Sequence, residues 1–243
     1  RLSVTLALAA LLLATAVFAM TVGAYSISVP DVFRTLSANI FPTGAVDSID
    51  RVHTTVIWNL RFPRVLLAVS VGVALASSGA VFQGCFRNPL VEPYILGVSS
   101  GAAFGAALGI VYPHIFLSVK VSAFIFGAVA VLSAWLLSRS KGETPVVTLI
   151  LAGVIIGSVF MALVSILKYL AQDAALREIV FWLMGGFYYA TWDDVRVAGP
   201  VALVCFAAMW AMGWKLNVLS MGDEEARALG VAPEAYKTAL VLL

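Results

Sequence analysis

Residues 65–86 read VLLAVSVGVALASSGAVFQGCF, a run of 22 residues without Asp, Glu, Lys or Arg. A helix needs about 20 apolar residues to span a bilayer. Five further uncharged stretches are long enough, or nearly so: residues 2–30, 93–119, 121–138, 145–167 and 197–214. Because a helix satisfies its own backbone hydrogen bonds in hydrocarbon, the sequence predicts six membrane-spanning helices, with a seventh beginning near Ala235.

The composition agrees with a membrane protein. Hydrophobic residues make up 62% and charged residues 12% of the 243 residues, whereas soluble domains carry about 25% charged residues. The net charge of +2 and the absence of a long basic run argue against a nucleic-acid binder. Cys85 and Cys205 are interpreted as small buried hydrophobic residues. The chain starts at Arg1 and stops within an apolar run, so we expect a fragment of a longer protein.

Two features concern topology. Residues 2–30 are far longer than the apolar core of a signal peptide, so they are expected to remain as a helix. Residues 179–192 are uncharged but too short to span, and their Gly185-Gly186 pair predicts a re-entrant or interfacial segment. The loops carry seven Lys and Arg residues on one side and eight on the other, which leaves the orientation undecided.

Two stretches carry small residues every four positions, which places them on one helical face. The first stripe consists of Ala68, Gly72, Ala76, Ala80 and Gly84, and the second of Gly97, Gly101, Gly105 and Gly109. Such faces let another helix approach closely in a membrane. Each stripe therefore predicts close helix packing, either static or as a moving interface.

Two patterns of the capping-box type predict short helices outside the spans. Ser28 and Asp31 precede apolar residues at helical spacing, which predicts a helix lying flat on the membrane surface. Ser220 and Asp223 predict a second capping box, with Gly230 ending a helix over residues 221–229. A helix that short is marginal in water, so it either meets a partner surface or is a solvated loop helix.

Several kinds of chemistry find no support. No predicted span has an ionisable residue near its centre, which argues against a proton-driven carrier and an intramembrane hydrolase. His53 and His114 are isolated and predict no metal site. The chain has no G-x-x-x-x-G-K-[ST] sequence for binding ATP. Arg61 and Arg64 lie beside a predicted span, where a guanidinium suits either an acidic partner or a lipid phosphate. The residues alone do not decide between these two interpretations.

Residues 61–108 read RFPRVLLAVSVGVALASSGAVFQGCFRNPLVEPYILGVSSGAAFGAAL. This stretch closely resembles the FecCD-like permeases of ATP-binding-cassette (ABC) importers, the family of iron-siderophore, haem and vitamin B12 uptake permeases. The matching elements are R-x-P-R, S-G-A-x-x-Q-G, F-R-N-P-L-x-E-P and L-G-V-S-S-G-A. Further matches follow at residues 151–153, 181–186 with 190–192, 216–223 and 226–230, so the resemblance covers nearly the whole chain.

The resemblance implies an all-α, polytopic transmembrane helix bundle of the type II importer permease kind. About ten helices are expected in the full subunit and six to seven here, with residues 1–243 as one permease domain. The implied partners are a second copy of the chain, two ATPase subunits that bind ATP and Mg²⁺, an extracytoplasmic substrate-binding protein and the lipid bilayer. The chain itself is expected to bind no cofactor and to lie in the cytoplasmic membrane with its N-terminus inside.

The resemblance also implies roles for particular residues. Residues 25–60 form an extracytoplasmic loop with a surface helix, and Arg61 and Arg64 match the positions that dock the binding protein. Residues 215–234 form a cytoplasmic loop that couples to the ATPase. Its coupling residues are Gly222, Asp223, Glu224, Glu225, Ala226, Arg227, Ala228, Leu229 and Gly230. The residues expected along the translocation path are Gly153, Gly157, Met161, Tyr188 and Tyr189.

The sequence departs from the family in two places. The last helices, with a G-x-x-G-L-x-x-P-H region, are missing, and Tyr188 and Tyr189 stand where small residues are common. The two tyrosines either select a bulky ligand or anchor the chain at the membrane interface. We expect a permease for a metal chelate, most simply a ferric siderophore. Haem, cobalamin or a molybdate-type oxyanion are alternatives, and a secondary carrier or a membrane enzyme is a more distant one.

Overall fold

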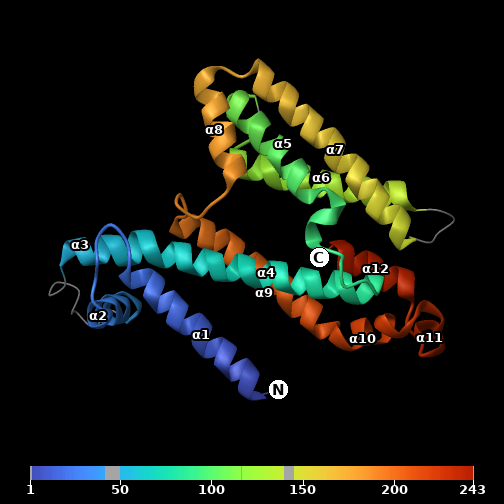
Figure 1. The fold of residues 1–243 in the computed structure, drawn as a ribbon, viewed down its shortest axis with the longest axis horizontal. Coiled ribbons are helices and arrows are strands. Elements are labelled where there is room, and N and C mark those ends of the chain that lie inside the picture. Colours follow the sequence, from blue (N-terminus) through green and yellow to red (C-terminus); the bar gives the residue numbers. More distant parts are fainter. Residues whose placement is uncertain (1, 42–49, 116, 140–144, 243) are drawn as a thin grey trace. The chain divides into compact units, whose positions relative to one another are not determined.

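The computed structural model describes residues 2–41, 50–115, 117–139 and 145–242, and the regular structure within these ranges is entirely helical (Figure 1). The helices before residue 100 are α1 (Leu2–Thr21), α2 (Val29–Ile40), α3 (Arg51–Thr54), the π-helix η2 (Thr55–Arg61), α4 (Phe62–Phe86) and the 3₁₀ helix η3 (Pro93–Leu96). They are followed by α5 (Val98–Val111), α6 (Val119–Ser138), α7 (Val146–Leu170), α8 (Asp173–Met184), α9 (Trp192–Ala211), α10 (Gly213–Met221), α11 (Asp223–Ala228) and α12 (Pro233–Leu242).

The chain divides into two compact units, which are described separately. Unit 1 contains residues 1–74 and 187–206, and unit 2 contains residues 75–186 and 207–243. The helices α4 and α9 therefore contribute residues to both units.

Five helical segments of the described residues are long and apolar enough to cross a membrane: Leu2–Thr21, Arg51–Phe86, Val119–Ser138, Val146–Leu170 and Trp192–Ala211. The sixth predicted span, over residues 93–119, is not one continuous helix. Gly97 adopts a left-handed backbone with φ 75° between η3 and α5, and α5 has only 14 residues. Pro113 then follows, and a residue before proline disfavours the helical conformation.

Unit 1 confirms the first capping box. The Ser28 hydroxyl accepts a hydrogen bond from the Asp31 backbone N–H at 3.4 Å and donates to the Asp31 carboxylate at 2.6 Å. The helix that follows, α2, packs Val32 into a core cluster with Met20, Ile27 and Ile57. The predicted loop over residues 25–60 thus contains α2, α3 and most of η2, while residues 42–49 lie outside the described residues.

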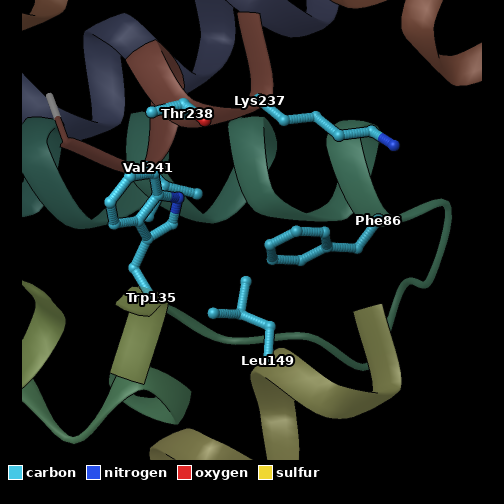
Figure 2. A pocket seen from close by; sticks show the side chains of 6 residues that line it. All are labelled: Phe86, Trp135, Leu149, Lys237, Thr238 and Val241. Atoms are coloured by element: carbon cyan, nitrogen blue, oxygen red, sulfur yellow. The ribbon is translucent and has the colours of Figure 1, made fainter. Parts of the chain in front are cut away.

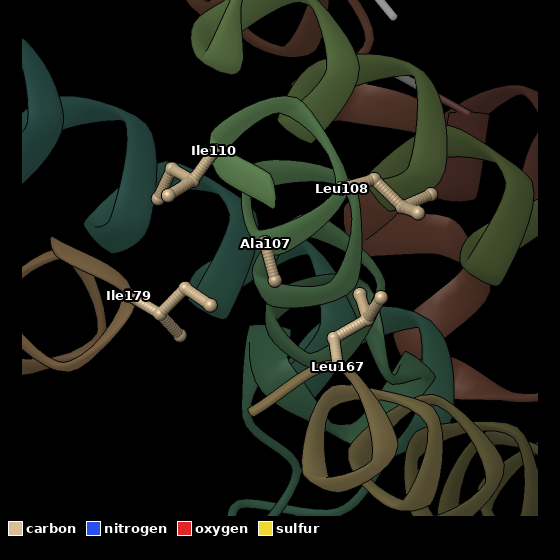
Figure 3. Packing of buried hydrophobic residues seen from close by; sticks show 5 residues of the cluster. All are labelled: Ala107, Leu108, Ile110, Leu167 and Ile179. Carbon is tan, nitrogen blue, oxygen red and sulfur yellow. The ribbon is translucent and has the colours of Figure 1, made fainter. Parts of the chain in front are cut away.

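Unit 2 is built around α5, which packs against α6, α7 and α8 (Figure 1). Its hydrophobic core cluster consists of Ala107, Leu108, Ile110, Leu167 and Ile179 (Figure 3). The cluster draws on three helices separated by up to about 70 residues, so it depends on the path of the chain as well as on local pattern.

The uncharged residues 179–192 do not form a separate element. Residues 179–184 complete α8, and the chain then breaks at Gly185 and Gly186, whose φ values are 70° and 142°. Glycine adopts such positive φ angles without a steric cost, which explains why the helix ends there. At the C-terminal side, α12 forms where the seventh helix is predicted to begin.

Candidate functional site

Arg61 lies at the end of η2 and binds the last turn of α1 and the segment that follows it. Its Nη1 donates to the carbonyl oxygen of Met20 at 2.6 Å, and its Nη2 donates to the carbonyl oxygen of Tyr25. Carbonyls at a helix C-terminus lack partners within the helix, so the guanidinium satisfies groups that would otherwise need water. A Cβ atom at Gly23 would lie 2.6 Å from Nη2 of Arg61, so glycine leaves room for this contact.

Arg64, one helical turn further on, binds the loop between α8 and α9. Its Nη2 donates to the carbonyl oxygen of Tyr188 at 2.7 Å, while its Nε is buried without a hydrogen-bond partner. The same loop is held a second time, because the Trp192 indole N–H donates to the carbonyl oxygen of Trp58 at 2.9 Å. Both predicted docking arginines therefore already hold backbone carbonyls within unit 1.

Tyr188 and Tyr189 form an edge-to-face pair with ring centroids 4.7 Å apart. Both rings are exposed, Tyr189 at 81% of its surface. The backbone that carries them is fixed by Arg64, so the exposed pair stands on a constrained loop rather than on a free one. Such an arrangement can offer two ring faces or edges to an aromatic or chelating ligand.

The other residues predicted along the path lie on α7. Gly153 crosses η3 closely, since a Cβ there would lie 2.0 Å from the Ile95 carbonyl oxygen. One turn later, Gly157 has the Ser100 hydroxyl and the Cα of Gly97 as its nearest neighbours. Met161 is 44% exposed. The two glycines thus allow the backbone of α7 to pass close to η3 and to the start of α5.

Six of the nine predicted coupling residues form α11, the other three flank it, and the C-terminal end of the helix has the predicted geometry. Gly230 has φ 78°, its N–H donates to the Arg227 carbonyl, and the Val231 N–H donates to the Ala226 carbonyl. These two bonds form the helix-ending Schellman arrangement, in which a left-handed glycine closes the last turn. Ala226 and Val231 are buried beneath the helix.

The predicted capping box at the start of this helix is wrong. Ser220 belongs to α10, and its hydroxyl donates to the Asn217 carbonyl at 2.7 Å. The N-cap of α11 is Gly222, with φ 150° and no side-chain cap. The Asp223 carboxylate instead accepts a hydrogen bond from a lysine of the next helix. The prediction failed because a hydroxyl and a carboxylate three residues apart each found a better partner.

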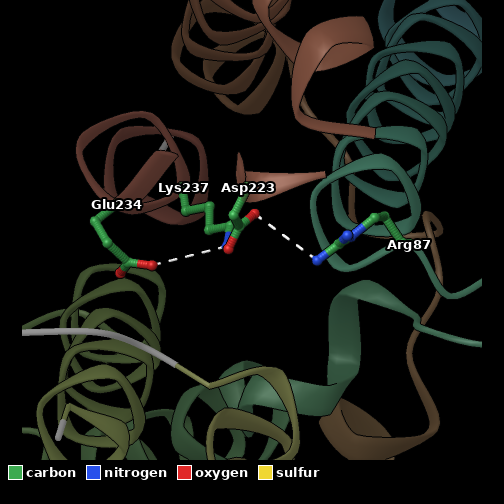
Figure 4. A network of polar contacts seen from close by, with 4 residues as sticks. All are labelled: Arg87, Asp223, Glu234 and Lys237. Carbon is green, nitrogen blue, oxygen red and sulfur yellow. Dashed lines mark hydrogen bonds and ion pairs between the residues drawn. The ribbon is translucent and has the colours of Figure 1, made fainter. Parts of the chain in front are cut away.

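That lysine belongs to a network of four charged residues (Figure 4). Lys237 Nζ lies 2.6 Å from Asp223 Oδ2 and 3.7 Å from Glu234 Oε1. On the other side, Arg87 Nη2 lies 3.8 Å from Asp223 Oδ1. The Lys237 side chain is only 8% exposed, so this ion pair is shielded from solvent. Lys237 does not stand out in the sequence, because 14 positions separate it from Asp223 and no local pattern relates the two residues.

A small cavity lies beside this network (Figure 2). Its lining residues are Phe86, Trp135, Leu149, Lys237, Thr238 and Val241. Its volume of about 10 Å³ is room for roughly one water molecule and far below the roughly 300–1,000 Å³ of typical ligand pockets. No group of three or more His, Cys, Asp or Glu side chains that could hold a metal ion occurs in the described residues. The arrangement therefore offers fixed surfaces and paired charges.

Comparisons with known proteins bear on nearly the whole chain. Residues 11–243 match the family model of the FecCD transport family. The chain is 38% identical over 234 residues to the molybdate import system permease protein MolB of Haemophilus influenzae, covering 96% of this chain and 68% of that protein. It is 41% identical over 194 residues to the hemin transport system permease protein HmuU of Yersinia pestis, covering 77% and 58% respectively.

A solved structure is similar over the full length of the chain. It is an inward-facing conformation of an ABC transporter assigned to the metal-chelate type, with a TM-score of 0.84 and 36% sequence identity. The match covers 100% of this chain and 72% of that one. The chain spans 68% of the molybdate permease and 58% of the hemin permease, so each relative contains a part without a counterpart here.

Proposed function

The chain belongs to the FecCD transport family, and on that premise we propose that it is the membrane-spanning permease subunit of a binding-protein-dependent ABC importer. It is an all-helical, multi-pass membrane protein. Its cargo is a metal chelate, with a ferric siderophore as the first candidate. The subunit acts as a homodimer and moves the cargo into the cytoplasm by alternating access, without bond-breaking chemistry of its own.

The observation that carries this proposal is the match to an inward-facing ABC transporter over the whole chain at 36% identity. The energy source is a pair of separate ATPase subunits, which hold ATP and Mg²⁺. ATP binding shifts the conformational equilibrium only to the extent that it favours one conformer over the other. The permease therefore supplies the element with two conformations, and the ATPase supplies the difference in free energy.

The proposed contact with the ATPase is α11. Glu224, Glu225 and Arg227 are exposed on it, whereas Ala226 is fully buried. We expect Glu225→Gln with Arg227→Gln to weaken co-purification of the ATPase, or to raise ATP consumption per transported molecule several-fold. A matched control changes Arg177 and Glu178, which are exposed on α8. Unchanged coupling in the α11 variant would contradict this contact.

The proposed docking residues for the binding protein are Arg61 and Arg64. A guanidinium has five N–H donors, and the contacts to Met20, Tyr25 and Tyr188 leave donors on both side chains. Carboxylates of the binding protein can occupy these donors in a charge-assisted pair. Reversing both charges to Glu is expected to abolish uptake.

Because both arginines also hold backbone carbonyls, charge reversal alone could act through folding. The decisive variant therefore combines the two Arg→Glu changes with reversal of surface carboxylates on the binding protein. Recovery of uptake in the combined variant supports docking. Wild-type uptake with the two permease changes alone would contradict it.

The cargo is tested by purifying the full-length protein with its ATPase and binding protein and reconstituting them in proteoliposomes. ATP-dependent uptake is compared for a ferric siderophore, haem, cobalamin and molybdate. The metal-chelate type of the structural neighbour favours the siderophore or haem, and the molybdate permease favours the oxyanion. If uptake follows a proton gradient and ignores ATP, the importer proposal fails and a secondary carrier replaces it.

We further propose that Tyr188 and Tyr189 lie on the cargo path and select the chelate. Their exposure and their constrained loop support this role. Changing both to Ala is expected to alter the ranking of the four cargoes in the same uptake assay. Gly153, Gly157 and Met161 on α7 belong to the same proposed path, so Met161→Ala offers a second variant. An unchanged ranking in both variants would contradict the proposed selection.

The surface position of α2 is also a proposal. The face of α2 that is turned inward is centred on Thr35, which is fully buried, whereas Val29, Phe33 and Ile40 are about half exposed. An amphipathic helix with its apolar residues outward suits the boundary of headgroups and acyl chains. In vesicles of brominated lipid, the fluorescence that Phe33→Trp adds to that of the six native tryptophans should be quenched more strongly than the fluorescence added by Arg34→Trp, which lies about 100° further round the helix. Equal quenching at both positions would contradict the surface placement.

A further inference from the structure

Arg87 has an unusual backbone for its residue type. It directly follows α4 and has φ 52°, and no other described non-glycine residue has a positive φ. The left-handed conformation after a helix is normally taken by glycine, because a Cβ atom crowds the backbone there. A side chain at this position therefore carries a conformational cost, which suggests that the guanidinium is retained for a contact of its own.

The partner of that guanidinium is Asp223, the first residue of α11. The two groups are 3.8 Å apart, which is within ion-pair range but too long for a hydrogen bond. Asp223 Oδ1 is buried and has no hydrogen-bond partner, although Arg87 is the group that faces it (Figure 4). A buried acceptor without a donor is unfavourable, so a small movement that brings Arg87 closer would be favourable.

The opposite oxygen of the same carboxylate is held tightly. Asp223 Oδ2 lies 2.6 Å from Lys237 Nζ, and the Lys237 side chain is 8% exposed. A further contact joins α12 to α10, because Lys215 of α10 lies over the ring of Tyr236 of α12, with Nζ 4.3 Å from the ring centroid. The carboxylate thus joins α11 firmly to α12 and loosely to the end of α4.

We infer that Asp223 is the joint through which α11 acts on the permease, with Lys237 and Arg87 as its positioning residues. The Lys237 contact makes α11 and α12 move together. The Arg87 contact is open in this conformation and closes when α11 is displaced toward α4. This inference rests on the proposed function, since it assigns a route for the force that the ATPase applies to α11.

The physical reason is the asymmetry of the two ion pairs. A shielded pair at 2.6 Å resists separation because breaking it leaves a buried charge. A half-exposed pair at 3.8 Å costs little to open or close, since solvent screens it. One carboxylate with a tight and a loose partner can therefore keep one contact while it exchanges the other. Two discrete arrangements of this kind are what conformational coupling requires.

The test uses Arg87→Gly in the full-length protein with its ATPase and binding protein. Glycine fits the left-handed backbone, so the thermal midpoint and the co-purification of the ATPase should be equal to wild type or higher. The uptake per ATP hydrolysed should nevertheless fall about five-fold or more, the lower end of typical coupling effects. Arg87→Lys restores the charge at the same strained position and is expected to recover part of the ratio.

A matched control is Arg196→Gln, which removes an exposed arginine that pairs with Asp193 at 3.1 Å on α9. It should leave both stability and the transport ratio unchanged. If wild-type uptake depends on ATP and Arg87→Gly keeps the wild-type uptake per ATP hydrolysed, the role of Asp223 as the joint is overturned while the proposed function stands. If wild type takes up cargo without any dependence on ATP, the proposed function fails before the joint is tested. A drop in stability in Arg87→Gly would mean that Arg87 serves the fold, which also overturns the inference.

Discussion

The stripe of small residues on α5 and the first part of the stripe on α4 have the same four-residue spacing but different surroundings. On α5, a Cβ at Gly101 would lie 2.4 Å from the Phe126 carbonyl oxygen, and one at Gly105 would lie 2.2 Å from that of Ser122. On α4, nothing among the described residues lies within 4 Å of a Cβ at Gly72, and Ala76 and Ala80 are exposed, whereas a Cβ at Gly84 would lie 2.9 Å from Cδ1 of Leu216.

The difference teaches what a spacing pattern can report. Small residues every fourth position make one face of a helix smooth, and this follows from helix geometry alone. Whether another backbone lies against that face depends on the path of the rest of the chain. The α5 stripe meets the α6 backbone within this chain, and Gly84 of the α4 stripe meets the Leu216 side chain, while the packing predicted for Gly72, Ala76 and Ala80 stays a prediction.

The largest effect is expected from adding a methyl group to the α5 stripe, which is packed against α6. Gly105→Ala places its Cβ against a backbone carbonyl, which cannot rotate away as a side chain can. We expect a loss of stability of about 3 kcal/mol, at the upper end of overpacking effects. The measurement is the unfolding free energy or thermal midpoint in detergent.

The matched variant on the open stripe is Gly72→Ala. No loss is expected there, because the position is open and alanine favours the helix over glycine by up to about 1 kcal/mol. Equal losses in the two variants would show that the two stripes do not differ in packing. Equal tolerance would mean that α5 can move away from α6 at little cost.

A second variant sharpens the comparison by asking what covers the α4 stripe in the assembled importer. Ala76→Leu adds a large side chain on the exposed face. If that face packs against another helix of the full assembly, the change should reduce uptake about ten-fold with little effect on the thermal midpoint of the isolated chain. Wild-type uptake would instead mean that the stripe faces lipid.

The smallest effect is expected at the two predicted capping serines. They too share a sequence pattern but differ in what the structure places around them. Ser28 caps α2, whereas Ser220 lies inside α10 and caps nothing. Ser28→Ala should therefore lower the unfolding free energy by about 1 kcal/mol, and Ser220→Ala should change it by only a few tenths. The same unfolding measurement checks both, and a larger loss at Ser220 would reverse the assignment.

Part of the candidate site follows from local sequence. Gly230 ends α11 because its left-handed φ closes the last turn with residues only three to five positions away. The cap at Ser28 and the break at Gly185 have the same character. Such features depend on interactions within about one helical turn, which a sequence displays directly.

Contacts between residues far apart in the chain could not be predicted from local sequence patterns. Arg61 and Arg64 stand out in the sequence, but their bonds to Met20 and Tyr188 cross 41 and 124 positions. The ends of α5 have a local cause in Gly97 and Pro113, but its burial is of long range, because its glycines let α6 and α7 approach closely.

The sequence by itself determined that this is a multi-pass helical membrane protein of the FecCD family, since uncharged runs of bilayer length and the residues 61–108 depend on no tertiary contact. Only the tertiary structure decided which small-residue stripe is filled and which lysine Asp223 binds. The physical reason is that helix formation in a membrane is governed by neighbours along the chain. The pairing of helix faces and of buried charges is governed instead by which distant segments the fold brings within a few ångströms.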